Sequence, residues 1–272
     1  MNLALGISTM NDGVYRALKN IEFKPVIIPV FIVHQVTNNL SYDVNIEALK
    51  EKNIFIVIDY NSGLSRSRNL LLKTAMRNHA EHLIISDDDV TYLWEKFREI
   101  EEGISKFPEA HIQLISLTER GGEQRKRYNE GIKYLSKREL FKVSSIEMCV
   151  NLKQIQKNEV LFDENFGLGS KYPVGEEAVF LTDLYVNGDK VVFIPIPFTC
   201  HPIESTGIRL FTERNMIYSR GALISRCYGL RFGIILVFIF WAKKFIFIRK
   251  VEGHVSKYIS LKEMIRGFYG IH

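Results

Sequence analysis

Cysteine is scarce in this chain of 272 residues, which excludes a scaffold held together by disulfides. The three cysteines, Cys149, Cys200 and Cys227, are odd in number and are not spaced as metal ligands or as a redox pair. We therefore expect reduced, mostly buried thiols without a chemical role, as is typical of a cytoplasmic protein.

Internal repeats and low-complexity segments are also absent, and 46% of the residues are hydrophobic and 25% charged. This is the composition of a globular protein, which excludes disordered and fibrous classes. The first residues, MNLALGISTMNDG, have no basic segment before the apolar run and no small-residue cleavage site. They predict a first strand rather than a signal peptide.

No apolar run reaches the roughly 18 to 20 residues that a transmembrane helix needs. The longest, FGIILVFIFWA at Phe232–Ala242, is followed directly by Lys243 and Lys244. Two alternatives remain for this segment: a buried core element, or an element lying in the membrane interface with its cations on anionic headgroups.

Acidic charge is nearly missing from the C-terminal part of the chain. Between Arg214 and Lys257 there are nine Lys or Arg residues and one acid, Glu252, so the net charge of this stretch is +8. Because the net charge of the whole chain is +5, the rest of the chain has a net charge of about −3. Because the basic character belongs to the tail alone, it favours the interfacial alternative there and argues against a nucleic-acid partner. We expect peripheral membrane contact through residues 214–257.

Short β-branched runs alternate with helical patterns in the first half of the chain, which is typical of βαβ units and a mixed, mostly parallel sheet flanked by helices. Strands are expected at residues 3–8, 26–33, 54–58, 83–86, 111–117, 146–151 and 191–196. Helices are expected at residues 14–21, 46–52, 67–79, 92–107 and 176–187. This predicts an α/β domain over residues 1–212, divided near residue 117, and a helical, apolar and basic extension over residues 213–272.

Three adjacent acids, Asp87, Asp88 and Asp89, follow the apolar strand LIIS. Adjacent carboxylates repel one another, and ligands of open α/β sheets bind at the carboxyl ends of strands. In an extended chain Asp87 and Asp89 share one side, where they can bind a hard cation such as Mg²⁺ or Mn²⁺, while Asp88 points elsewhere. The alternative is a solvated turn that caps the following helix.

A second motif, DYNSGLSRSRN at Asp59–Asn69, lies upstream of the acids. Its Arg66, Arg68 and Asn69 stand at or near a helix start, where backbone N–H groups and guanidinium groups favour phosphate oxygens. The alternative is a surface loop with solvated arginines.

GLSRSRN, followed by a helix, a strand and SDDD, resembles the nucleotide-sugar half of family 2 glycosyltransferases with the glycosyltransferase-A fold. The resemblance covers roughly residues 1–200. It implies Arg68 near the nucleotide diphosphate, Asp87 and Asp88 at the nucleotide sugar, and Asp89 with Asp87 as ligands of Mn²⁺ or Mg²⁺. It also places Thr9 and Asp12 at the base and ribose, and Gln35 where an Asp is commoner.

The glycine-rich segment FGLGSKYPVGEEAVFL at Phe166–Leu181 resembles the second-half signature of the same family. The match implies Glu177 as the catalytic base, with Glu176 as the alternative, because an inverting transfer needs a carboxylate to accept the proton of the acceptor hydroxyl. Acids in a first helical turn also stabilise a helix by its dipole alone. His201 could complete the metal site, or be a structural histidine.

The resemblance implies a nonprocessive enzyme, since no Gln-x-x-Arg-Trp follows the acidic helix. We therefore predict transfer of one sugar from a nucleotide-diphosphate sugar, with UDP as the expected nucleotide, to a saccharide or polyprenyl-diphosphate-linked acceptor at the cytoplasmic membrane face. Two other classes remain open. A nucleotidyltransferase also uses metal-binding carboxylates, and a membrane-surface or nucleic-acid binding module would use the basic tail.

Overall fold

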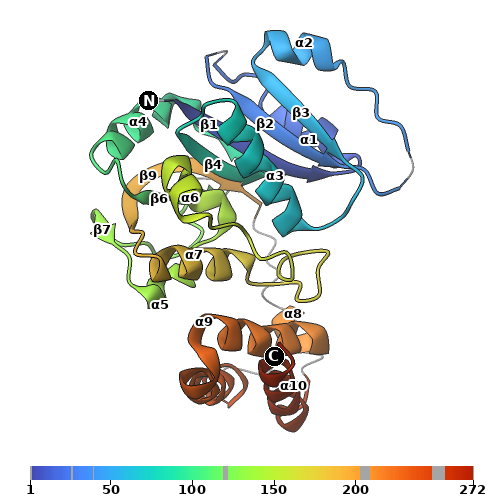
Figure 1. The fold of residues 1–272 in the computed structure, drawn as a ribbon, viewed down its shortest axis with the longest axis vertical. Coiled ribbons are helices and arrows are strands. Elements are labelled where there is room, and N and C mark those ends of the chain that lie inside the picture. Colours follow the sequence, from blue (N-terminus) through green and yellow to red (C-terminus); the bar gives the residue numbers. More distant parts are fainter. Residues whose placement is uncertain are drawn as a thin grey trace.

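The computed structural model describes residues 2–25, 27–38, 40–118, 122–202, 209–246 and 255–271. In this part of the chain a nine-stranded sheet has the order β3-β2-β1-β4-β8-β6-β9-β5, and β7 also pairs with β9. Figure 1 shows helices packed on the sheet and a separate C-terminal group of helices beyond one end of it.

Four strands form a continuous parallel half of the sheet. They are β1 (Leu3–Met10), β2 (Val30–Gln35), β3 (Ile54–Asp59) and β4 (His82–Asp87). Their side chains alternate between the two faces, so that Ala4 joins one hydrophobic core while Leu3 and Leu5 join the other. Because the strands are parallel, the polar residues at their carboxyl ends lie along the same edge.

The other half of the sheet is mixed. It contains β5 (Thr91–Tyr92), β6 (His111–Thr118), β7 (Lys133–Tyr134), β8 (Met148–Asn151) and β9 (Val191–His201). β8 runs antiparallel between β4 and β6, β6 and β9 are parallel, and β5 and β7 run antiparallel to β9. The structure confirms the predicted α/β class with a mixed sheet flanked by helices.

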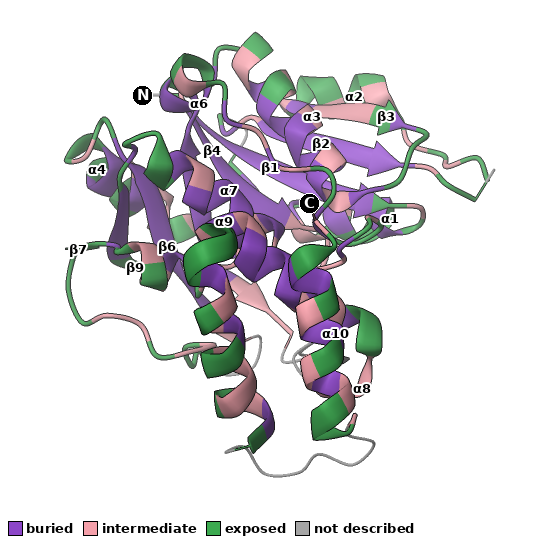
Figure 2. Cartoon of the chain, turned by 60° about the horizontal axis from the view of Figure 1, so that its bottom comes forward, coloured by how far each residue is buried: buried purple, intermediate pink, exposed green. Residues whose placement is uncertain are grey.

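Helices pack on both faces of the sheet and bury its apolar side chains. One face is covered by α3 (Leu64–Arg77), α5 (Lys137–Leu140), α6 (Leu152–Asn158) and α7 (Glu176–Val186). The other is covered by α1 (Gly13–Asn20), α2 (Ile46–Glu51) and α4 (Phe97–Ser105). Short 3-10 turns lie at η1 (Trp94–Lys96) and η2 (Ser145–Glu147). Figure 2 shows the buried residues concentrated in the strands.

Two helices begin three or more residues away from the predicted position. α3 begins at Leu64 rather than residue 67, because Gly63 adopts a φ of +124° and turns the chain directly into the helix. The helix expected over residues 92–107 begins at Phe97, because Tyr92 instead pairs with β9 and packs its ring 5.6 Å from that of Phe198.

The C-terminal part consists of α8 (Arg209–Thr212), α9 (Arg214–Trp241), a π-helical turn η4 (Ala242–Ile246) and α10 (Lys257–Tyr269). Gly229 has the non-helical angles φ 70° and ψ 175°, which interrupt α9. The Arg220 guanidinium carbon lies 5.9 Å from the centre of the Phe240 ring. Twenty residues of straight helix would separate them by about 30 Å, so the chain folds back on itself at Gly229.

By length and composition alone, the segment Arg214–Ile246, which has 33 residues, could cross a membrane. Its most apolar 18-residue window has a mean hydropathy of 1.8, and 33% of that window is buried in the protein. The fold-back at Gly229 divides it into two arms, each shorter than the roughly 20 residues that a spanning helix needs.

The C-terminal helices pack on the α/β part of the chain through α9. Ala222 and Leu223 share a hydrophobic cluster with Val179 of α7. Arg226 of α9 adds ion pairs to Asp183, at 2.7 Å, and to Asp163, at 3.1 Å. These contacts fix α9 beside the carboxyl edge of the sheet.

Candidate active site

A large cleft lies at the carboxyl ends of β1, β2 and β4, with a volume of about 1370 Å³. The N-terminal ends of α3 and α7 and the first arm of α9 complete its wall. Five carboxylates and four guanidinium groups among the described residues line it: Asp87, Asp88, Asp89, Glu176, Glu177, Arg16, Arg68, Arg125 and Arg220. The cleft therefore concentrates ionisable groups at the edge where α/β sheets bind ligands.

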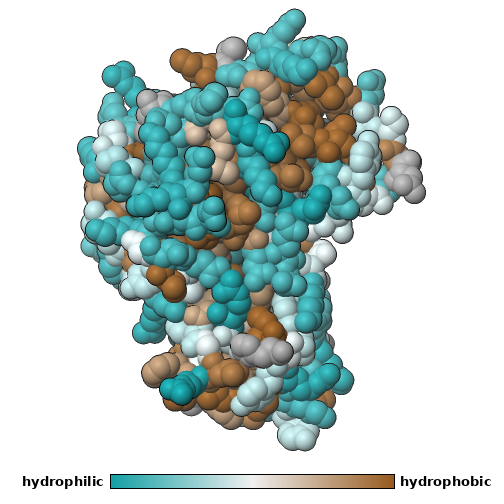
Figure 3. All heavy atoms as spheres, in the orientation of Figure 1, coloured by the Kyte–Doolittle hydropathy of each residue, from teal (hydrophilic) through white to brown (hydrophobic). Residues whose placement is uncertain are grey.

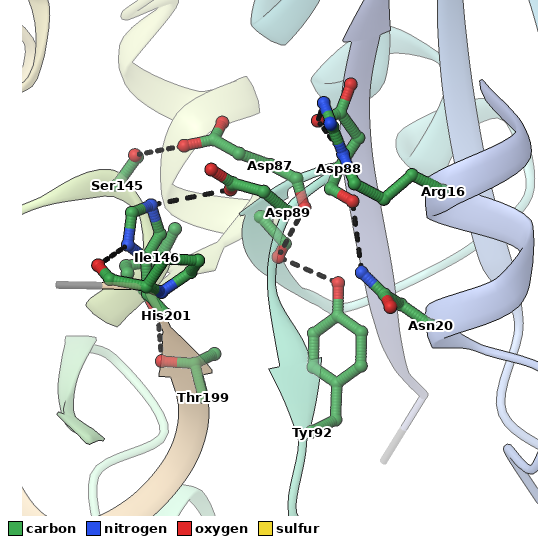
Figure 4. A network of polar contacts seen from close by, with 12 residues as sticks. Arg16, Asn20, Asp87, Asp88, Asp89, Tyr92, Ser145, Ile146, Thr199 and His201 are labelled. Atoms are coloured by element: carbon green, nitrogen blue, oxygen red, sulfur yellow. Dashed lines mark hydrogen bonds and ion pairs between the residues drawn. The ribbon is translucent and has the colours of Figure 1, made fainter. Parts of the chain in front are cut away.

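The three aspartates at the end of β4 point in different directions (Figure 4). Asp88 turns toward α1, where it accepts hydrogen bonds from Thr9, at 2.6 Å, and from Arg16. Asp87 lies on the opposite side, with Ser145 of η2 at 3.4 Å. Asp88 is thus held by the protein, whereas Asp87 and Asp89 face the region of β9 and η2.

Asp89 and His201 face each other across the cleft (Figure 4), with Oδ1 and Nε2 3.4 Å apart. Nδ1 of His201 lies 2.7 Å from the Pro202 carbonyl, which can only accept, so Nδ1 carries a proton and donates it. Asp89 Oδ1 is buried and has no hydrogen-bond partner in the described chain. A proton on either group or a cation between the two groups has to join them, because two acceptors repel.

The acidic surroundings also affect protonation at this position. Burial raises the pKa of Asp89, and Asp87 and Asp88 raise it further, while His201 lowers it. No group of three or more His, Cys, Asp or Glu side chains in the described residues is arranged to enclose a metal ion. Asp89 and His201 nevertheless fit a cation of the Mg²⁺ or Mn²⁺ type, which takes one or two protein ligands and fills its other positions with phosphate oxygens and water.

Arg68 of α3 contacts acids from both β4 and α7. Its side chain is only 1% exposed, and it donates hydrogen bonds to Glu176, at 3.0 Å, and to Asp87, at 3.3 Å. Glu177 lies 3.6 Å away. Burial lowers the pKa of Arg68, but Asp87, Glu177 and Glu176 outweigh this effect and raise it. One buried cation thus holds three carboxylates from β4 and α7 together.

The two acids at the start of α7 have different surroundings. The Glu176 side chain is 7% exposed and bonded to Arg68, whereas that of Glu177 is 20% exposed. Burial raises the pKa of Glu176 to about 7, Glu177 raises it as well, and Arg68 opposes both effects. Gly167 packs close to Glu176, since a Cβ there would meet its Cδ at 3.2 Å. Glu176 is therefore enclosed, and Glu177 is the more accessible carboxylate.

The remaining residues of the sequence prediction lie at the β1–β2 side of the cleft. Thr9 and Gln35 line it, and Gln35 donates to Asp59, at 3.2 Å, and to the Gly63 carbonyl. Burial disfavours the ionised form of Asp59, but hydrogen bonds from Arg66, Asn61 and Gln35 lower its pKa to about 2. Asp12 is exposed at the start of α1 and is not part of the cleft lining.

Sequence reasoning missed several residues that line the cleft. Arg16 binds Asp88 from α1, and Ser145 approaches Asp87 from η2. Met216 and Arg220 enter from α9, where the sequence indicated only a basic and apolar tail. No local motif marks these four residues, because their position depends on how distant elements pack. Arg125, from the segment between β6 and β7, also lines the cleft, while residues 119–121 of that segment lie outside the described chain.

Searches of protein-family models and of curated proteins find no match to this chain. Solved structures of TarS from S. aureus, a glycosyltransferase, do match it. A fragment of TarS, residues 1–349, aligns with a TM-score of 0.62 at 11% identity, over 97% of this chain and 81% of that one. This is a glycosyltransferase fold.

Two further TarS structures share that glycosyltransferase fold. The complex of the same fragment with UDP-GlcNAc has a TM-score of 0.64 at 13% identity, over 97% of this chain and 81% of that one. The complex with UDP has a TM-score of 0.61 at 13% identity, over 92% and 76%. The likeness extends through the C-terminal helices, since it covers nearly the whole chain.

Proposed function

We propose that this protein is an inverting glycosyltransferase that moves one sugar from a nucleotide-diphosphate sugar to a saccharide or lipid-linked saccharide. The observation that carries the proposal is the meeting of the aspartate triplet of β4 with Glu176 and Glu177 of α7 around buried Arg68, at one cleft of a glycosyltransferase fold. Packing of the fold does not require five carboxylates in one cleft. These carboxylates repel one another, and a bound cation can offset the cost.

UDP is the nucleotide that we propose for the donor. Structures with the same fold have been solved with UDP and with UDP-GlcNAc. Thr9 and Gln35 would lie at the nucleoside, with Asp12 near it at the edge of the site. Asp87, Asp88 and Arg68 would lie at the ribose, sugar and diphosphate. The cleft is large enough for a nucleotide sugar with an acceptor beside it.

A divalent cation, Mn²⁺ or Mg²⁺, is the proposed cofactor. Asp89 and His201 would hold it, with Asp87 on the same side of the chain, and the unpartnered Oδ1 of Asp89 supports this assignment. When bound, such an ion stabilises negative charge on a departing nucleoside diphosphate.

Glu177 is the proposed catalytic base, because it is the more accessible of the two α7 acids. In this role its carboxylate accepts the proton of the acceptor hydroxyl as that oxygen bonds to the anomeric carbon. The bond from the anomeric carbon to the diphosphate oxygen breaks at the same time, on the opposite face of the sugar. Glu176 is held by Arg68 and would position the start of α7.

Peripheral attachment to the cytoplasmic membrane face is a further proposal, and it would bring a polyprenyl-diphosphate-linked acceptor to the cleft. An interfacial stripe on the second arm of α9 and η4 supports it. The stripe exposes the side chains Leu230, Phe232, Ile235, Phe238, Ile239 and Ile246. Arg231 and Lys243 are exposed beside it. Figure 3 shows hydrophobic side chains at the end of the molecule where α9 and α10 lie. Residues 247–254 of the expected contact lie outside the described chain.

The direct test is release of UDP from a panel of UDP-sugars with Mn²⁺, first with water as the slow acceptor. We expect one sugar to be turned over, and Glu177→Gln to lower the rate about 100-fold or more. Glu51→Gln, which changes an exposed acid of α2, is the control and should be neutral. Formation of UTP and sugar 1-phosphate from the UDP-sugar when pyrophosphate is added, without release of UDP, would indicate a nucleotidyltransferase and overturn the proposal.

A further inference from the structure

Two of the four guanidinium groups of the cleft, those of Arg125 and Arg220, have no ion pair or side-chain hydrogen bond among the described residues, and of these two Arg220 is the one whose Nε is buried. Arg16 is bonded to Asp88, and Arg68 is bonded to Glu176 and Asp87. Among the described residues, Arg220 Nε is buried without a hydrogen-bond partner, and Arg220 has no ion pair. It lines the cleft from the first arm of α9, over the ring of Phe240 from the second arm.

The Nε–H group of Arg220 is costly to bury without a hydrogen bond, because it loses water and gains nothing in return. Burial lowers the pKa of Arg220, and Glu177 and Glu176 oppose this effect only through space. A guanidinium carries five N–H donors in a fixed planar array that matches the oxygens of a phosphate or carboxylate. An oxyanion entering the cleft would supply the missing partner.

The side of the cleft on which Arg220 lies indicates where such an oxyanion comes from. The first arm of α9 packs against the start of α7, since a Cβ at Gly175, directly before Glu176 and Glu177, would meet the Leu223 side chain at 2.6 Å. Glu177 and Glu176 are also the charges that act on the pKa of Arg220. The proposed base stands at this side, and the hydroxyl that it activates has to approach from there. An anion bound by Arg220 would therefore lie next to the acceptor hydroxyl.

We propose that Arg220 forms an oxyanion subsite on the acceptor side of the cleft, so that the acceptor carries a phosphate or carboxylate close to its reacting hydroxyl. This inference rests on the proposed function and adds the chemical class of the acceptor. The fold-back of α9 at Gly229 serves this subsite, because it brings Phe240 over the guanidinium and keeps it in the cleft.

The test is calorimetric titration of inorganic phosphate, at constant ionic strength, into protein saturated with UDP and Mg²⁺. We expect the wild type to bind phosphate with UDP in place, and Arg220→Gln to weaken that binding about tenfold or more, since a charge-assisted hydrogen bond is lost. Arg220→Lys should retain part of the affinity. Arg231→Gln, an exposed change on the second arm of the same helix, is the control and should bind like the wild type.

A titration of UDP alone into the same variants separates the two sources of an oxyanion and also shows that the variants fold. We expect Arg220→Gln to bind UDP within twofold of the wild type. If it loses UDP affinity instead, Arg220 serves the donor diphosphate and the inference is wrong. Unchanged phosphate binding in Arg220→Gln would also overturn it. Failure of the wild type to bind UDP would contradict the proposed function itself.

Discussion

Arg68 is a cation buried among three acids, and its removal has consequences for folding as well as for ligands. The Arg68 side chain is 1% exposed, and it is the shared partner of Asp87, Glu176 and Glu177. Arg68→Met would leave the buried Glu176 and the partly exposed Asp87 and Glu177 without this partner, and we expect the free energy of unfolding to fall by about 3 kcal/mol. Urea denaturation followed by circular dichroism measures this loss.

The control for that experiment is Arg98→Met, which breaks an ion pair between side chains that are 89% and 64% exposed. It should cost less than about 1 kcal/mol, since exposed pairs contribute little. Equal losses in the two variants would show that Arg68 is not the shared partner of the three acids.

Glu176 should make the stability depend on pH in a defined direction. Its pKa in the folded protein is raised from 4.5 to about 7, so the folded state binds a proton that the unfolded state has released. The resulting stabilisation is fully present below pH 4.5 and is lost as the pH rises through about 7.

We therefore expect the wild type to lose stability relative to Glu176→Gln between these pH values, by on the order of 2 to 3 kcal/mol. Urea denaturation of both proteins at a series of pH values gives the difference. If the free energy of unfolding of the wild type, relative to that of Glu176→Gln, stays constant or rises with pH over this range, Glu176 is ionised at all of these pH values.

At the scale of single residues, the sequence predicts cleft residues where they belong to a short motif. Arg68, the three aspartates and the α7 acids were found from two motifs and a strand end, and the structure brings them to one cleft. Arg16, Ser145 and Arg220 were not found, because each reaches the cleft through packing between segments distant in sequence.

At the scale of single elements, α9 is where the sequence was least informative. Its composition indicated an apolar and basic tail, but the reversal at Gly229 arises from one residue in a left-handed region. The reversal packs Gly233 closely on Phe268 of α10, since a Cβ there would meet its ring at 2.6 Å. Only the packed structure shows which side chains of the apolar run are buried and which form the interfacial stripe.

The interfacial stripe predicts binding to anionic membranes. The Phe232 and Ile235 side chains are 73% and 57% exposed, and each loses contact with water on entering an interface. Phe232→Ser with Ile235→Ser should weaken binding to vesicles of phosphatidylcholine and phosphatidylglycerol about tenfold or more in a co-sedimentation assay.

Phe23→Ser is the matched control, because Phe23 is 84% exposed but lies in the α/β domain, away from the stripe. It should bind vesicles like the wild type. Equal binding by the double variant and the control would remove the stripe as a membrane contact. Binding that is unchanged when phosphatidylglycerol is omitted would exclude a role for the flanking cations.

At the scale of the whole molecule, the alternation of strands and helices predicted the class of fold, and each of the four strands in the parallel half overlaps a strand expected from the sequence. The sequence could not predict how β8 inserts between β4 and β6, since pairing between distant strands leaves no local pattern. Nor could it show that α9 forms part of the cleft wall. The site thus depends on the α/β domain and the C-terminal helices together.

We propose above all that the cleft binds a nucleoside diphosphate through the aspartates of β4 and a divalent cation. Isothermal titration of UDP into the wild type, with and without Mn²⁺, and into Asp89→Asn measures this binding. We predict binding that requires Mn²⁺ and that Asp89→Asn weakens by at least about tenfold, because a cation ligand is lost. If UDP fails to bind with Mn²⁺ present, or binds equally well to Asp89→Asn, the claim is contradicted.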